Sequence, residues 1–296
     1  MKEGMPMDKP YAIMTEAACD LPRERFEKAG VLVAPLPITI NGVNYQHHPD
    51  ETGLSYRAFY RMLRDKIQGV TGAPSPETYA ATARAALETG QDVLYLGFTS
   101  QLSACYQSAK LALEELKQKF PLRKILMVDT LSGAMGHGLL VELAARGREA
   151  GWSIEEAALA VERYKLKVAH YFTVADLHHL RRSGRVGALS AVVGTMLQLK
   201  PILALNDKGV IYMAEKVRSY QRALNRLTDL VKEKAVNLKS QIVYISHADI
   251  EDIAQKLADK IRTLGAREVV VHLLGPVIAN HVGPGALGIS FLTAKR

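Results

Sequence analysis

Two loops rich in hydroxyl side chains lead into helix-like sequence, where a bound anion would be stabilised. Residues 71–76 read Thr-Gly-Ala-Pro-Ser-Pro, and residues 99–103 read Thr-Ser-Gln-Leu-Ser. Free backbone N–H groups and the helix dipole favour a carboxylate or phosphate at such positions, and Thr71 can donate a further hydrogen bond. A plain helix cap by Ser75 explains the first loop equally well. Neither loop is specific alone, but together they indicate one convergent anion site.

Two glycine-rich loops are further candidates. Residues 129–138 read Asp-Thr-Leu-Ser-Gly-Ala-Met-Gly-His-Gly, in which the glycines allow close backbone approach to a ligand. The loop is not a Walker loop, because no Gly-Lys-Ser/Thr follows, and a Rossmann fingerprint is also absent from the sequence. Residues 281–286 place His281 beside a rigid Gly-Pro-Gly turn. That histidine either hydrogen-bonds a ligand or partner group, or is structural.

Metal and nucleophile chemistry find little support in the sequence. The nine histidines are scattered, and neither His47-His48 nor His178-His179 has a further ligand at helical spacing. No His-Glu-x-x-His, Cys-x-x-Cys or Gly-x-Ser-x-Gly motif occurs. Cys105 lacks an activating neighbour and is interpreted as a small buried residue. The sequence therefore predicts no metal, no cofactor and no catalytic residue.

Length and composition indicate a globular protein of two domains. The chain has 296 residues, of which 48% are hydrophobic and 23% charged. The N-terminal sequence has no apolar segment typical of a signal peptide, and no apolar run reaches the roughly 18 residues that a membrane span needs. The two cysteines, Cys19 and Cys105, suit a reducing compartment. We therefore expect a cytoplasmic protein without stable membrane insertion.

The net charge of +8 comes from one part of the chain. Residues 161–240 carry 15 Lys and Arg against 6 Asp and Glu, so the remaining residues are nearly neutral. A nucleic-acid-binding protein is one interpretation, but the segment lacks basic–aromatic interleaving or a recognition motif. Solvated lysines on helical faces, or a docking surface for an acidic protein partner, account for the same charge.

Strands alternate with helices in the first half of the chain. Apolar runs typical of strands lie at 11–15, 31–40, 92–99 and 124–129. Helical patterns lie at 76–89, 102–120 and 135–150. This alternation predicts a mainly parallel sheet between helices.

The second half predicts a mixed sheet with helices. A helix is expected from a Ser153 cap to about residue 168, followed by a short strand at 172–174 and a glycine-rich turn at 183–187. Residues 206–209, Asn-Asp-Lys-Gly, predict a hairpin. The remaining expected elements are helices at 220–237 and 249–264 and strands at 241–246, 268–274 and 288–293. We therefore expect an α/β protein of two domains, 1–165 and 166–296.

These loops, in this order, resemble the DegV family of bacterial fatty-acid-binding proteins over nearly the whole chain. Residues 71–76 are similar to the family's Thr-Ser-x-Pro-Ser-Pro. Residues 100–109, Ser-Gln-Leu-Ser-Ala-Cys-Tyr-Gln-Ser-Ala, are similar to Ser-x-Leu-Ser-Gly-Thr-Tyr-Gln-Ser-Ala. Further matching segments lie at 13–22, 176–185, 200–203, 216–218 and 281–286.

The resemblance implies one long-chain fatty acid in a buried tunnel between the two domains. It implies that hydroxyl groups of the first domain bind the carboxylate; these are Thr71, Thr99, Ser100 and Ser103. Arg185 and His281 match positions near the head group or a partner surface. The resemblance also implies that the carboxylate is presented to a separate ATP-dependent kinase, which makes acyl phosphate for phospholipid synthesis. The sequence departs from the family pattern at several positions, which are Glu16, Ala17, Gly72, Ala104, Cys105 and Ser183.

Two other functions compete with a fatty-acid carrier. A small-molecule enzyme, such as a kinase or hydrolase, could use the cleft between the domains. It requires a nucleotide loop or an activated nucleophile, and the sequence has neither. Nucleic-acid binding is suggested only by the isoelectric point of about 9.3. Binding driven by phosphate contacts would weaken steeply with salt, which makes that interpretation easy to test.

Overall fold

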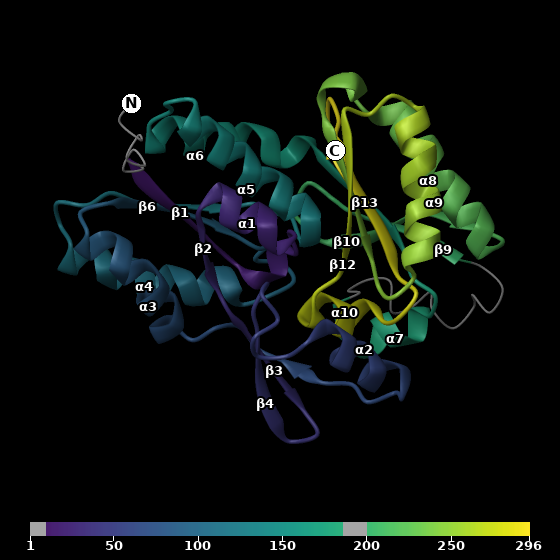
Figure 1. The fold of residues 1–296 in the computed structure, drawn as a ribbon, viewed down its shortest axis with the longest axis horizontal. Helices are drawn as coiled ribbons and strands as arrows, with labels where there is room; N and C mark the ends of the chain where they lie inside the picture. The colour runs from purple at the N-terminus through teal and green to yellow at the C-terminus, as the bar shows by residue number, and fades with distance from the viewer. Residues whose placement is uncertain (1–9, 186–199) are drawn as a thin grey trace, which may run out of the picture.

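The structure, a computed structural model, describes residues 10–185 and 200–296. Its two halves each have a sheet covered by helices (Figure 1). The expected turn at 183–187 and the apolar sequence after it lie partly outside the described residues. The architecture is the two-domain α/β fold that the sequence predicts, with a parallel first sheet and a mixed second sheet.

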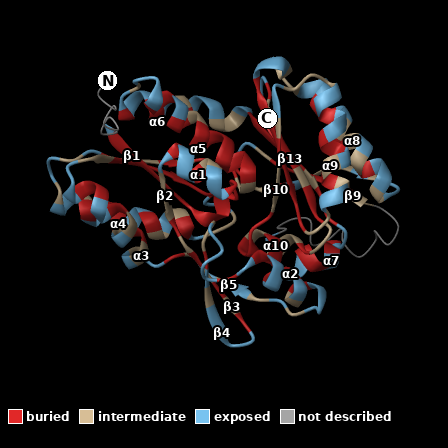
Figure 2. Ribbon diagram, viewed as in Figure 1, coloured by how far each residue is buried: buried red, intermediate tan, exposed pale blue. Residues whose placement is uncertain are grey.

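The first sheet has the strand order β2-β1-β6-β7, and its pairings are parallel. Its strands are β1 (Tyr11–Glu16), β2 (Val31–Ala34), β6 (Asp92–Gly97) and β7 (Ile125–Asp129). Its helices are α1 (Arg23–Ala29), α3 (Pro76–Glu88), α4 (Cys105–Lys119), α5 (Ala134–Glu149) and α6 (Ile154–Tyr164). Side chains alternate across β1, so that Met14 packs in the core with α3 and α4 whereas Ile13 packs with α1, α5 and α6. The sheet is therefore buried on both faces, as Figure 2 shows.

A small antiparallel sheet projects from the first half. It has the order β4-β3-β5 and is built from β3 (Leu36–Ile40), β4 (Val43–His47) and β5 (Val70–Thr71). The expected single strand at 31–40 is wrong, because the chain leaves the first sheet after Ala34 and enters the small sheet at Leu36. Pro35 lies between them, and proline cannot donate to a strand ladder. Helix α2 (Tyr56–Arg64) connects β4 to β5.

The second sheet has the order β10-β9-β8-β13-β11-β12. Its strands are β8 (Val168–Thr173), β9 (Lys200–Leu205), β10 (Ile211–Val217), β11 (Ile242–His247), β12 (Glu268–Leu273) and β13 (Leu287–Leu292). Among the described strands, β11 and β12 pair in parallel and the other pairs are antiparallel. The hairpin predicted at 206–209 is confirmed between β9 and β10.

Helices α8 (Tyr220–Lys234) and α9 (Glu251–Thr263) cover the outer face of this sheet. The inner face turns toward the first half of the chain, where α5 packs against it. One core cluster accordingly joins Ile13 of β1 and Leu140 of α5 to Tyr244 of β11. Two short helices, α7 (Leu177–Arg182) and α10 (Pro276–Val282), lie side by side at one end of the second sheet (Figure 1).

The helix expected to run to residue 168 ends earlier. Helix α6 stops at Tyr164, one turn of 3-10 helix covers Lys165–Lys167, and β8 begins at Val168. Val168 is fully buried and pairs with Leu292 of β13. Pairing with a distant strand therefore overrides the local helical tendency. Similarly, α4 begins at Cys105 rather than at residue 102, because residues 98–104 form a loop above the sheet.

Candidate functional site: a cavity between the two sheets

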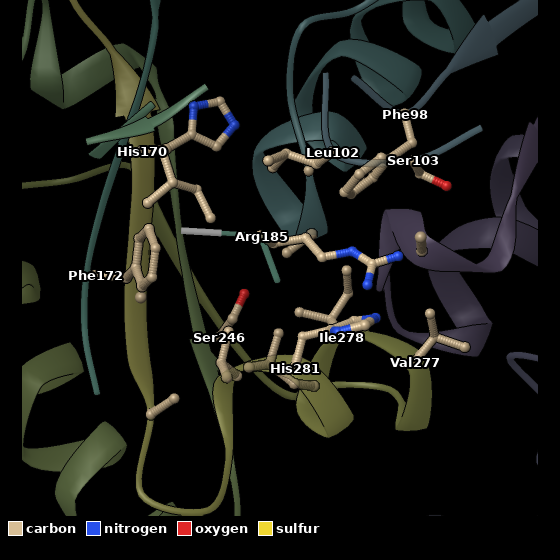
Figure 3. Close-up of a pocket in the computed structure, with 18 of the residues that line it drawn as sticks. Phe98, Leu102, Ser103, His170, Phe172, Arg185, Ser246, Val277, Ile278 and His281 are labelled. Atoms are coloured by element: carbon tan, nitrogen blue, oxygen red, sulfur yellow. The ribbon is translucent and has the colours of Figure 1, made fainter. Parts of the chain in front are cut away.

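A cavity of about 390 Å³ lies between the two halves and is lined by residues of both. Its walls are mainly apolar. Phe98 and Leu102 come from the first half, and Phe172, Leu205 and Ile211 come from the second sheet. Figure 3 shows Phe98 and Leu102 across the cavity from Phe172, with the Arg185 side chain reaching into the space between them. The volume lies in the range typical of ligand pockets, and the lining suits an apolar ligand.

Polar groups meet at one end of this cavity. Thr71 ends β5, and its Oγ1 lies 2.8 Å from Nε2 of His281 in the last turn of α10. Arg185 lines the same end and is exposed, so it stands at the mouth. Its Nη1 donates to the Ser183 carbonyl at 2.7 Å. A cation, a hydroxyl and an imidazole at the open end of an apolar cavity are groups that can bind an anion.

His281 is neutral at pH 7 in this setting. Burial lowers its pKa to about 4, and the charges of Arg185 and His179 lower it further. Its Nδ1 is buried without a partner among the described residues. When the ring proton is on Nε2, the imidazole donates to Thr71. The Thr71 hydroxyl is then free to donate its own proton to an anion in the cavity.

Ser103 lies on the opposite wall of the mouth. Its Oγ accepts a hydrogen bond from the Cys105 N–H at 3.2 Å and lies 3.0 Å from Cys105 Sγ. Ser103 Oγ therefore binds the first N–H group of α4, and the residue also borders the cavity. Burial raises the pKa of the Cys105 thiol to about 12. Cys105 is thus a protonated thiol at pH 7, and it is buried as the sequence predicts.

Thr99 and Ser100 are not among the lining residues, unlike Thr71, Ser103, Arg185 and His281. Thr99 is fully buried, and its hydroxyl donates to the Gly209 carbonyl at 3.0 Å. Ser100 is exposed, and its backbone N–H donates to Asp129 at 3.3 Å. Thr99 instead ties the loop of the first half to the β9–β10 hairpin. This contact holds the two walls of the cavity together.

Glu16 supports the same loop from below. It is fully buried at the end of β1, where Oε1 accepts from the Phe98 N–H at 2.5 Å and Oε2 from the Tyr95 hydroxyl at 2.8 Å. Burial is the main reason that its pKa is raised to about 7. Because Phe98 lines the cavity, Glu16 positions part of the wall. The sequence marks this position only as a departure from the family pattern.

The lining residues that the sequence interpretation did not include as site residues comprise the polar residues His170, Ser246 and Ser290. The period of two along a strand places His170 and Phe172 on one face. It does not show that β8, β13 and β11 are neighbours, which is what brings the three residues together. Strand order across a mixed sheet was the missing information.

Comparison with known proteins identifies the family. A family described as "Uncharacterised protein, DegV family" matches residues 10–294. The chain belongs to the DegV family. A DegV domain-containing protein of Clostridium perfringens is 34% identical over 285 residues, which cover 96% of this chain and 98% of the relative.

Solved DegV structures share the fold. A DegV family protein from Thermus thermophilus, described by its fatty acid binding, has a TM-score of 0.87 and 30% identity and covers 96% of this chain and 99% of its own. A stearic acid-binding protein from Eubacterium ventriosum has a TM-score of 0.84 and 26% identity, covering 96% and 98%. Both of these structural neighbours are described as binding fatty acids.

Two further properties concern the described residues of this DegV chain. Within residues 10–185 and 200–296, no helix is long and apolar enough to cross a membrane. In the same residues, no group of three or more His, Cys, Asp or Glu side chains is arranged to hold a metal ion.

Proposed function

We propose that this chain binds one long-chain fatty acid in the cavity and catalyses no reaction of its own. The observation that carries the proposal is an apolar cavity that ends in a polar mouth. Burial of an acyl chain contributes about 0.8 kcal/mol per methylene group. The tail therefore provides most of the affinity, and a few polar groups orient the carboxylate.

The carboxylate rests on Thr71 and Ser103 in this proposal. Thr71 donates its hydroxyl proton, because neutral His281 can supply the hydrogen bond that Thr71 accepts at 2.8 Å. Arg185 provides the compensating positive charge at the mouth. Thr99 and Ser100 hold the loop that carries Ser103. Without these donors, a partly buried carboxylate would be costly.

The second part of the proposal is that the protein presents the bound fatty acid to a partner protein. A separate ATP-dependent kinase transfers a phosphoryl group to the carboxylate, which gives acyl phosphate for phospholipid synthesis. The open mouth supports this, because a carboxylate beside exposed Arg185 is accessible from outside. Exposed Arg181 and Arg182 add positive charge where anionic ATP would approach. The supply of ATP makes the cytoplasm the place of reaction.

Native mass spectrometry of the purified protein, followed by denaturing extraction, tests the binding. We expect one adduct per chain that extracts as a C14–C18 fatty acid. The Thr71→Val variant removes the donor at nearly constant shape, and hydrogen bonds to charged groups contribute about 1.5–3 kcal/mol. Palmitate should therefore bind the variant roughly ten- to a hundredfold more weakly in a fluorescence displacement assay.

Thr82→Val is the matched control. Thr82 lies on α3, its hydroxyl donates to the Thr78 carbonyl at 2.8 Å, and it does not line the cavity. The Thr82→Val variant should bind palmitate with the same affinity as the parent protein. A protein without an adduct that also takes up neither palmitate nor oleate would refute the proposed function.

A further inference from the structure

The inner face of the second sheet places polar side chains in the apolar part of the cavity wall. His170 on β8, Ser246 on β11 and Ser290 on β13 all line the cavity. Phe172 and Leu205 on the same face are apolar. Successive side chains of a strand point to opposite faces, so every residue on the face that contacts an apolar ligand could be apolar. The three polar residues therefore need an explanation that the binding of a plain acyl chain does not provide.

Strand register gathers these three residues into one patch. His170 lies directly opposite Ser290, and Ser246 lies opposite Gly288, two residues before Ser290. Side chains directly opposite are about 5 Å apart, and diagonal neighbours about 7–8 Å. Helix α5 closes the patch from above. A methyl group at Gly136 would lie 2.1 Å from His170 Nε2 and 2.8 Å from Ser290 Oγ.

The polar atoms of the patch lack partners among the described residues. The three residues are 7%, 8% and 9% exposed in the order His170, Ser246, Ser290. No side-chain hydrogen bond joins Ser246 or Ser290 to another described residue, and the Ser246 hydroxyl points into the cavity (Figure 3). His170 Nε2 is buried without a partner.

The protonation of His170 follows from its other nitrogen. Nδ1 lies 3.1 Å from the Val168 carbonyl oxygen, which can only accept, so Nδ1 carries the proton. Burial holds the pKa of His170 well below its usual value. The ring is therefore neutral at pH 7, and Nε2 is an acceptor. Gly136 of α5 covers Nε2, so the patch offers the cavity the two serine hydroxyls, each of which can either donate or accept.

We propose that this patch recognises a hydroxyl group on an internal carbon of the acyl chain, so that the preferred ligand is a hydroxy fatty acid. The inference rests on the proposed function and specifies the class of ligand. A plain chain would cover the serine hydroxyls without pairing them, which is unfavourable. A ligand hydroxyl accepts from one serine and donates to the other. A keto oxygen only accepts, and a double bond offers no such donor.

Competition measured by native mass spectrometry tests the inference. The protein is equilibrated with equal amounts of stearic acid and one positional isomer of hydroxystearic acid, and the two adducts are resolved by the mass of one oxygen. The isomers are tested one at a time. We expect one internal position, with its neighbours, to be favoured about tenfold over stearic acid, because a site built for a hydroxyl disfavours a ligand without one.

The variants assign that preference to the patch. Ser246→Ala combined with Ser290→Ala should lower the ratio of bound hydroxystearic acid to bound stearic acid at least fivefold. The single variant Ser246→Ala is measured as well, in case the double variant does not fold. Thr173→Val is the control, because Thr173 is another fully buried β8 residue with an unpaired hydroxyl among the described residues but does not line the cavity. Its ratio should match that of the parent protein.

Each outcome has a distinct meaning. Stearic acid bound in preference to every hydroxy isomer would overturn the inference and leave the proposed function intact. A hydroxyl preference that persists in the serine variants would also overturn it. A failure to bind any of these acids would instead count against the proposed function.

Discussion

Asp20 is a carboxyl group that the fold removes from water. It is 3% exposed in the segment between β1 and α1, and its Oδ1 accepts from the Gly275 N–H at 3.2 Å. Oδ2 has no partner among the described residues. Burial raises the pKa of Asp20 to about 8 from an ordinary value of 3.8. The side chain is thus protonated at pH 7, at the contact between the two halves of the molecule.

The raised pKa of Asp20 predicts a loss of stability in alkali. A carboxyl group whose pKa is raised in the folded state contributes its full stabilising free energy below pH 3.8, the ordinary pKa. This stabilisation is lost as the pH rises through 8, the pKa in the folded protein. The Asp20→Asn variant keeps the shape of the side chain but removes the group that titrates. We therefore expect its melting temperature, relative to the parent protein, to increase between pH 5 and pH 9.

Asp50→Asn is the control for this measurement. Asp50 is exposed, and hydrogen bonds from Thr52 lower its pKa, so the sign is opposite. It should show no relative gain in alkali. Equal pH profiles for Asp20→Asn and the parent protein would mean that Asp20 is ionised in the fold.

At the residue scale, the sequence was informative where a motif is local. The Thr71 loop and the His281 turn were both recognisable as short patterns, and the structure joins them by a 2.8 Å contact. Ser246 and Ser290 have no such pattern around them. Their meaning depends on which strands are neighbours, and no local feature of the chain encodes that.

Helix α7 forms a basic element at the mouth of the cavity. Arg181 and Arg182 are exposed in its last turn, and Arg185 follows it. His179 of α7 lies 2.9 Å from the Asn280 carbonyl of α10, the helix that carries His281. The exposed arginines are therefore held close to the proposed head-group site.

Charge reversal on α7 tests the proposed partner. In a reaction reconstituted with the kinase, Arg181→Glu with Arg182→Glu should slow acyl phosphate formation at least tenfold, because electrostatic steering changes association rates by 10–10³-fold. The affinity for palmitate should change little. Formation of ADP is the measurement.

The control for charge reversal lies on the other side of the second sheet. Lys232 of α8 and Lys256 of α9 are exposed on the helices that cover its outer face. Lys232→Glu with Lys256→Glu makes the same change in charge and should leave the rate unaltered. Equal rates for both double variants would argue against a docking role for α7.

At the element scale, the sequence predicted the long periodic helices and missed short elements. Helices α1, α2, α7 and α10 and the β3–β4 hairpin were not expected. The hairpin had a recognisable signal, since Asn41 and Gly42 both have positive φ, of 50° and 77°, as the tight turn of a hairpin requires. Helix α10 has only seven residues, too few for a clear period.

Arg296 joins separate parts of the whole molecule. Its guanidinium donates to the Leu131 carbonyl at 3.0 Å and the Ser132 hydroxyl at 3.0 Å in the first half. It also donates to the Asn206 carbonyl at 3.1 Å in the β9–β10 hairpin. The carbonyls of Lys165 and Val168 accept at 2.8 Å each. One side chain thus connects the first half, the second sheet and the passage between them.

Replacement of Arg296 should destabilise the protein as a whole. Arg296→Met retains much of the apolar stem but leaves several half-buried carbonyls unpaired, so the free energy of unfolding should fall by about 3 kcal/mol. Urea unfolding measures the change. Because Leu131 and Ser132 precede Gly133 in the cavity wall, palmitate should also bind more weakly.

Arg262→Met provides the comparison for this variant. Arg262 is exposed on α9, and its Nη1 donates to Asp259 at 2.7 Å. An exposed pair contributes about 0–1 kcal/mol, so the effect should be small. Similar losses of unfolding free energy in the two variants would show that the contacts of Arg296 between the halves contribute no more to stability than an exposed ion pair.

At the scale of the molecule, the two-domain α/β architecture followed from the alternation of strands and helices. The contacts that align the two halves did not follow. Arg296 and Thr99 bind carbonyl oxygens far away in sequence, and a backbone carbonyl carries no residue type that a pattern could reveal. The residues at the mouth of the cavity could therefore be predicted from the sequence, but the hydrogen bonds that hold its two walls together could not.

A cavity placed between two sheets has a consequence for the lifetime of the protein in a cell. An acyl chain in that position would pack against both halves at once and complete a shared core. Binding to the folded state alone stabilises it by about 2.7 kcal/mol at a ligand concentration of a hundred times Kd. Proteases degrade chains that open, and changes of 1–2 kcal/mol alter abundance several-fold. The amount of this protein would then follow the supply of its ligand, without any change in its synthesis.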